Sequence, residues 1–90
     1  MANKKSAIKR LRSAKRRQLR NRNFRGQART AVKKARQKIE AGRLEEAQEA
    51  VRVASVALDK AAQKGIIHKN NAARRKSRLM QQLNRAERAT

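Results

Sequence analysis

The clearest pattern in the sequence is a stripe of apolar residues in its middle third, recurring at spacings of three and four. Such spacing places side chains on one face of a helix. The stripe consists of Leu44, Ala47, Val51, Ala54, Leu58 and Ala61. A second apolar group, on an adjoining face, consists of Ala50, Val53, Val56 and Ala57. We therefore predict a helix near residues 44–64 that is buried on two sides and ended by Gly65.

A second helix is predicted upstream of this one. Its apolar stripe consists of Phe24, Ala28, Ala31, Val32, Ala35 and Ile39. The stripe stops before Gly42, a residue type that commonly terminates helices. The chain has no proline, so this helix can extend back to Ser6 or Asn3, either of which could cap it. Gly26 is the one weak point inside it.

A third amphipathic helix is predicted downstream, entered through Ile66 and Ile67. Its apolar residues, which we interpret as core, are Ala72, Ala73, Leu79, Met80, Leu83 and Ala86. Three helices with short connections predict an all-α fold, an antiparallel three-helix bundle forming a single domain over residues 1–90. The first helix, about 52 Å from Ser6 to Glu40, is longer than the second, at about 32 Å. It should overhang the bundle, with residues 1–25 as a basic N-terminal extension.

Composition removes several classes of function. Half of the 38% apolar share is alanine, so the core must be thin. Without cysteine and with one histidine, neither a disulfide nor a metal site is expected, and no cofactor is predicted. Ser13, Ser55 and Ser77 have no acid and base nearby in the sequence, so we predict no enzyme and no small-molecule substrate. No apolar run reaches the length of a membrane span and no secretory signal is present, which predicts a cytoplasmic protein.

Charge is the strongest indication of a partner. There are 27 Lys and Arg residues against 6 Asp and Glu, for a net charge of +21. Residues 1–38 contain sixteen of these cations and no carboxylate. Such an excess repels itself and needs a polyanion. We predict that residues 7–25 are frayed in the free protein and become helical on a phosphate surface.

Among polyanions, nucleic acid fits better than a membrane. The overhanging segment has no compact apolar face of the kind that a membrane-surface helix carries. Arginine forks suit phosphate oxygens, whereas single-strand stacking would need more aromatic residues than Phe24, which we interpret as core. The residues favour binding to the backbone and shape of folded nucleic acid, and leave RNA and DNA both open.

The motifs NKKSAIKRLR, KRRQLRNR, RTAVKKAR and GIIHKNNAARRKSRL occur in this order along the chain. In this respect the chain resembles, end to end, the bacterial family of ribosomal protein twenty of the small subunit. The resemblance implies a non-enzymatic, early-assembling primary binder of small-subunit ribosomal RNA, in contact with its 5′ domain and 3′ minor domain. It also implies few contacts with other ribosomal proteins. Arg43 departs from the family, which often has a polar or acidic residue at this helix start.

The resemblance also implies a set of RNA-binding residues. In the first helix these are Lys4, Lys5, Ser6, Lys9, Arg10, Lys15, Arg16, Arg17, Arg20, Asn21, Arg22 and Arg29. In the last motif they are His68, Lys69, Asn70, Arg74, Lys76, Ser77 and Arg78. Asn70 or Asn71 could instead cap the third helix, and His68 could serve as a hydrogen-bonding group in the turn.

Two other classes of function remain open at this point. A nucleoid-type protein that compacts DNA would share the charge but should bind duplex DNA as well as ribosomal RNA. An intracellular regulator of an acidic enzyme would need no nucleic acid.

Overall fold

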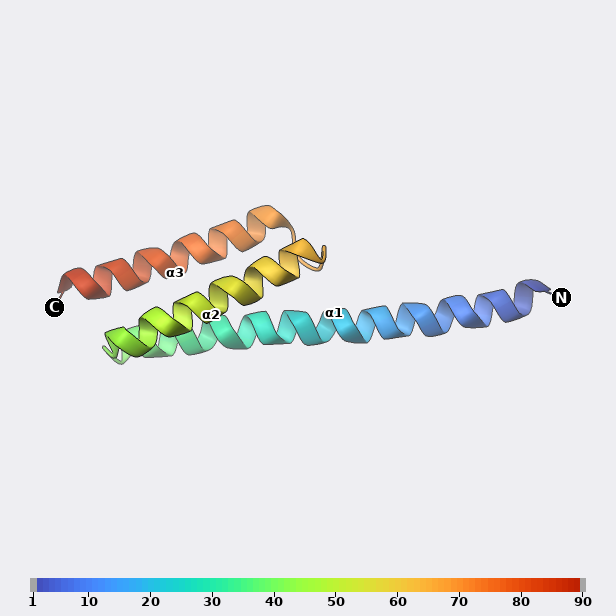
Figure 1. Cartoon of the computed structure of the whole chain (residues 1–90), viewed down its shortest axis with the longest axis horizontal. Helices are drawn as coiled ribbons and strands as arrows, with labels where there is room; N and C mark the ends of the chain where they lie inside the picture. The colour runs from blue at the N-terminus through green and yellow to red at the C-terminus, as the bar shows by residue number, and fades with distance from the viewer. Residues whose placement is uncertain (1, 90) are drawn as a thin grey trace.

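The computed structural model describes residues 2–89, which form three helices joined by two short turns. Helix α1 spans Ala2–Glu40, α2 spans Leu44–Gln63 and α3 spans Lys69–Ala89. Consecutive helices run antiparallel, and α1 extends well beyond the other two toward the N-terminus (Figure 1). The predicted all-α fold, with an overhanging first helix, is therefore confirmed.

Both turns contain a glycine in the left-handed region. Gly42 has φ +74° and Gly65 has φ +75°. After α1, the N–H of Gly42 bonds the Ile39 carbonyl and the N–H of Arg43 bonds the Lys38 carbonyl. These are the two bonds of a Schellman cap, which satisfies carbonyls left open at a helix end. The predicted glycine stop at Gly42 is confirmed.

The same pair of bonds closes α2. The N–H of Gly65 bonds the Ala62 carbonyl at 3.0 Å, and the N–H of Ile66 bonds the Ala61 carbonyl at 2.9 Å. This cap turns the chain so that Ile66 is buried against the bundle, with 7% of its surface exposed. The predicted return of the chain through the isoleucine pair is confirmed.

The core is small and rich in alanine, as the composition predicts. One cluster of buried residues joins the three helices: Ala28, Val32, Ala35, Val51, Ala54, Leu58, Ala72 and Leu79. Alanine faces allow helix backbones to approach closely, and Leu58 and Leu79 are the largest fully buried side chains. The 3-4 stripe predicted for α2 therefore identifies its buried face correctly.

Two predictions about burial are wrong in part. Val53 and Val56 are 48% and 43% exposed, whereas Ala50 and Ala57 of the same predicted face are half-buried and pack against the core. In α3, Ala73 is exposed and Met80 is 51% exposed. The reason is geometrical: the core that joins the three helices lies along the 3-4 stripe of α2, and burial extends from it to Ala50 and Ala57 but not to Val53 and Val56.

The overhang follows from unequal helix lengths. With 39 residues α1 is about 58 Å long, whereas the 20 residues of α2 span about 30 Å. Side chains from Lys4 to Arg20 are all exposed. Contact with the rest of the bundle begins at Phe24, whose ring centroid lies 4.8 Å from Lys64 Nζ. At the next residue, Arg25 Nη2 donates to the Ile66 carbonyl at 3.4 Å.

The start of α1 corrects one prediction. The helix begins at Ala2, so neither Asn3 nor Ser6 is its N-cap. The structure has residues 2–40 as one continuous helix, whereas the sequence predicts fraying of residues 7–25 in the free protein. That coil-to-helix change on binding stays a prediction, as does the single-domain organisation with residues 1–25 as its basic extension.

Candidate nucleic-acid interface

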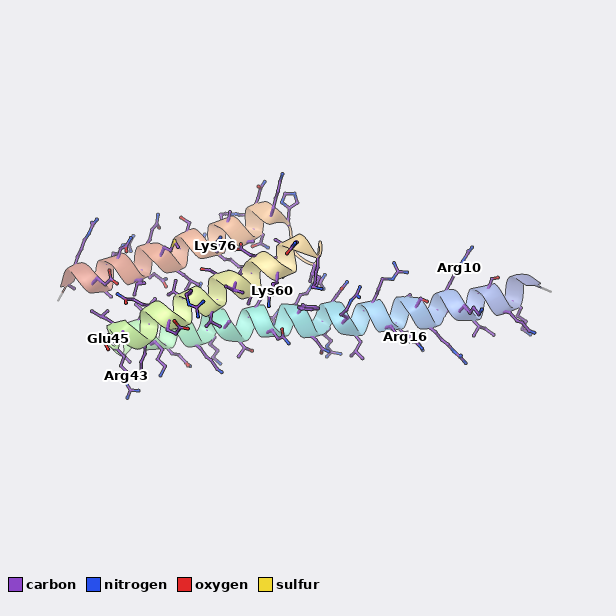
Figure 2. The ribbon with its side chains drawn as sticks, viewed as in Figure 1. Arg10, Arg16, Arg43, Glu45, Lys60 and Lys76 are labelled. Atoms are coloured by element: carbon purple, nitrogen blue, oxygen red, sulfur yellow. The ribbon has the colours of Figure 1, made fainter. Side chains whose placement is uncertain are left out.

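The overhanging part of α1 presents positive charge on all sides. The predicted residues there are Lys4, Lys5, Ser6, Lys9, Arg10, Lys15, Arg16, Arg17, Arg20, Asn21 and Arg22, all exposed except the half-buried Asn21. Figure 2 shows the side chains of this segment projecting from both sides of the helix, Arg10 and Arg16 among them. Because the first 38 residues contain no carboxylate, these cations repel one another along the helix. The overhang is thus a rod with uncompensated charge all around it.

A second basic surface lies where α1 and α3 meet. A groove between the two helices is lined by Val32 and five cations: Arg29, Lys33, Arg36, Arg75 and Arg78. The two hairpin turns bring these residues together although they lie in the first and last helices. Five guanidinium and ammonium groups around one groove form a place where phosphate oxygens could be held by several donors.

This groove contains two residues that the sequence predicts, Arg29 and Arg78, and three that it missed. Lys33, Arg36 and Arg75 line the same groove. A signal was present in α1, because Arg29, Lys33 and Arg36 follow helical spacing next to the core residue Val32. The other predicted α1 residues lie on the overhang, away from this groove.

His68 caps the third helix. Its Nδ1 accepts a hydrogen bond from the N–H of Asn70 at 3.1 Å, and its carbonyl accepts the N–H of Ala72 at 3.1 Å. His68 is therefore the N-cap of α3. Asn70 and Asn71 lie inside the helix, so the suggestion that either caps it is wrong; Asn71 Oδ1 instead accepts from Arg75 Nε at 3.1 Å.

Replacing His68 tests this capping role. His68→Ala should lower the free energy of unfolding by about 1 kcal/mol, because one N–H of the first turn loses its acceptor. His68→Asn should keep most of the stability, because asparagine is a favoured N-cap. Urea unfolding of the two variants at pH 7 measures both. Equal losses in the two variants would contradict the cap.

Not every predicted cation of α3 is available to a partner. Lys69, Asn70, Arg74, Ser77 and Arg78 are exposed, but Lys76 is half-buried. Lys76 Nζ donates to both carboxylate oxygens of Asp59 in α2, at 3.0 and 3.1 Å. This ion pair joins α2 to α3, so Lys76 has a structural partner in addition to its predicted contact with RNA.

Three acidic residues of α2 form ion pairs within the bundle: Glu46, Glu49 and Asp59. Lys38 Nζ donates to Glu46 Oε2 at 2.9 Å; this bond, and then the charge of Lys38, hold the pKa of Glu46 below its usual value of 4.5. A hydrogen bond from Arg52, followed by its charge, lowers the pKa of Glu49 in the same way. Glu45 and Glu46 also lie in the first turn of α2, where negative charge is favoured. This carboxylate-rich helix is the part of the fold least suited to a polyanion.

The lowered pKa of Glu46 predicts a pH dependence. Its pair with Lys38 stabilises the fold above pH 4.5, and that stability is lost as the pH falls through the lower pKa of the folded state. Glu46→Gln should therefore be less stable than the parent chain at pH 7, and the difference should vanish in acid. Urea unfolding at pH 7 and at an acid pH below the folded-state pKa of Glu46 measures this difference in stability, with Glu45→Gln as the control. A difference that persists in acid would contradict this assignment.

Residues 2–89 give no support to metal binding, membrane crossing or base stacking. They contain no group of three or more His, Cys, Asp or Glu side chains that could hold a metal ion. No helix among them is long and apolar enough to cross a membrane. The Phe24 ring is half-buried and lies under Lys64, so it is not an open platform for base stacking.

Comparison with known proteins identifies the family. The profile of the family described as Ribosomal protein S20 matches residues 2–84. The chain belongs to this family. It is 58% identical over 84 residues, 93% of the chain and 85% of the relative, to "Small ribosomal subunit protein bS20" of Thermomicrobium roseum. The protein of the same name from Roseiflexus sp. is 54% identical over 90 residues, covering 100% of the chain and 98% of the relative. That from Geobacillus thermodenitrificans is 51% identical, covering 93% and 94%.

Family membership confirms the broad prediction. The family comprises ribosomal proteins and not enzymes, so the chain is a ribosomal protein of the bacterial cytoplasm. The resemblance carried by the basic motifs and by GIIHKNNAARRKSRL is thereby confirmed over almost the whole chain. The comparisons give no reason to retain the DNA-compacting alternative.

Proposed function

We propose that the chain is a structural constituent of the small ribosomal subunit that binds small-subunit ribosomal RNA directly and holds separate RNA segments together. The observation that carries this proposal is the pairing of two basic surfaces on one chain: the carboxylate-free overhang of α1 and the five-cation groove between α1 and α3. A phosphate contact on each surface would fix two RNA segments at a set separation. Binding of this kind recognises backbone and shape.

The overhang suits insertion between RNA segments. Its charge surrounds the helix, so phosphates on different sides can be neutralised together. Residues 2–22 extend about 30 Å along the axis. The bundle then serves as the anchor that fixes the direction of α1, through the contacts at Phe24 and Arg25.

The proposal includes an early place in assembly. Both basic surfaces belong to this chain alone, so binding to RNA requires no surface from a second protein. The family resemblance points to the 5′ domain and the 3′ minor domain as the RNA segments, and to few contacts with other ribosomal proteins. A primary binder should therefore bind naked ribosomal RNA.

A competition experiment tests the proposal. At one moderate salt concentration, labelled 5′-domain RNA is bound and then challenged with one of four unlabelled competitors: 5′-domain RNA, 3′ minor-domain RNA, an unrelated folded RNA of equal length, or duplex DNA. We expect the unrelated RNA and the DNA to compete much more weakly than unlabelled 5′-domain RNA. Equal competition by all of them would overturn specific ribosomal binding, and strong competition by DNA alone would favour a DNA-compacting role. Salt must be fixed because phosphate binding depends steeply on it.

A further inference from the structure

Gly26 occupies a position in α1 where the fold has no need of glycine. It lies in the interior of a continuous helix and does not have the positive φ seen at Gly42 and Gly65. A Cβ added at residue 26 would meet nothing within 4 Å. Alanine would therefore fit without strain, and it would favour the helix more than glycine does.

Close packing inside the protein does not explain this glycine. Small residues often allow two helices to approach, but the space next to Gly26 is open. The residue is exposed and lies just after the point where α1 enters the bundle, beside the Arg25 bond to Ile66. Its missing side chain leaves a bare stretch of helix backbone facing outward.

The surroundings of this bare stretch are basic. A shallow hollow in the surface of α1 contains Gly26 and is lined by Leu19, Arg22, Asn23 and Arg29, among other α1 residues. Arg22 lies four residues before Gly26 and Arg29 three residues after it, which places both on the same side of the helix as Gly26. The two arginines start about 10 Å apart along the axis. A phosphate chain lying across Gly26 would meet a guanidinium on either side.

We propose that the ribose-phosphate backbone of the bound RNA lies directly against the α1 backbone at Gly26, between Arg22 and Arg29. The ligand is a polyanion with a compact repeating unit, and the absence of a Cβ lets a ribose approach the helix more closely than at any neighbouring residue. A ribose 2′-hydroxyl can donate to a helix carbonyl, which has a second lone pair free. This inference rests on the proposed function, because it assigns one contact within that RNA interface.

Substitutions of increasing size at residue 26 test the proposal. Gly26→Ala should raise the Tm of the free protein by a few degrees and lower affinity for 5′-domain RNA about threefold. Gly26→Leu should also fold, because leucine is a good helix former, and should lower affinity tenfold or more although no charge is lost. Gln37→Leu, an exposed position of the same helix outside the hollow, is the matched control and should bind as the parent chain does. Unchanged affinity of Gly26→Leu would overturn the proposal.

A second comparison separates close approach from a hinge. If Gly26 served to bend α1, a new glycine beside it should restore binding to the Gly26→Ala variant. Close approach predicts instead that Gly26→Ala with Gln27→Gly binds no better than Gly26→Ala with Gln27→Ala. Restored binding would overturn the proposal in favour of a hinge. If the parent chain itself shows no preference for 5′-domain RNA, both the proposed function and the Gly26 contact fail. If the parent chain shows that preference and the Gly26 variants bind as tightly as it does, only the contact fails.

Discussion

Replacing Arg16, Arg17 and Arg20 together with glutamine is expected to weaken binding to 5′-domain RNA about a hundredfold at roughly 0.1 M salt. All three residues are exposed on the overhang, where no carboxylate of the first 38 residues can neutralise them. Each phosphate contact that is lost removes about 0.7 to 0.9 from the slope of log affinity against log salt. We therefore expect a slope shallower by about 2 to 3, measured by titration at several salt concentrations, with the bundle still folded.

The matched control removes the same number of charges at α2. Changing Arg43, Arg52 and Lys60 to glutamine lowers the net charge equally, but Arg52 and Lys60 lie on the helix that carries most of the carboxylates, and Arg43 is its N-cap. Arg43 and Arg52 already pair with Glu46 and Glu49. This control should change the slope little. Equal effects of the two triple variants would show that net charge, and not the overhang, governs binding.

The same overhang variant has a second expected effect, on the free protein. Arg12, Arg16 and Arg20 repel one another at helical spacing. The variant removes two of these three charges, Arg16 and Arg20, together with Arg17. If residues 7–25 are frayed without RNA, this removal should raise the helicity of the free protein at low salt. Circular dichroism of the parent chain and the variant at low salt measures this. Full helicity of the parent chain under those conditions would contradict the predicted fraying.

Local signals in the sequence predicted the helices well. The end of α1 and the end of α2 follow from Gly42 and Gly65, because a left-handed cap is a local requirement that glycine meets best. The buried face of α2 follows from the 3-4 spacing of its apolar residues. Charge distribution and helix length predicted the overhang. None of these features depends on how the helices are arranged around one another.

The features that the sequence predicted wrongly depend on tertiary arrangement. An apolar pattern shows that Val53, Val56 and Met80 could be buried, but not whether a neighbour lies on their side of the helix. The capping role of His68 depends on the geometry of the turn after Gly65. The preference of N-caps for asparagine suggested Asn70 or Asn71 instead, because it contains no information on that geometry. The groove depends on both hairpins, since they bring Arg75 to Arg36.

Replacing Leu58 with alanine is the change expected to damage the fold most. Leu58 has none of its surface exposed and lies in a core that otherwise consists largely of alanine and valine. Such small neighbours cannot move to fill the space left behind, so we expect a loss of about 3 to 5 kcal/mol. A 90-residue domain commonly has only about 5 to 13 kcal/mol in total, and self-repulsion among its cations lowers this further.

Val56→Ala is the matched control for this change. Val56 lies two residues away in the same helix but is 43% exposed, so its truncation should cost less than about 1 kcal/mol. Urea unfolding followed by circular dichroism compares the two variants, and equal losses would contradict the assigned core. RNA that binds only the folded chain should recover part of the lost helicity of Leu58→Ala, because ligand binding draws the equilibrium toward the folded state. A thin core is sufficient for this protein if the polyanion that neutralises its charge also stabilises its fold.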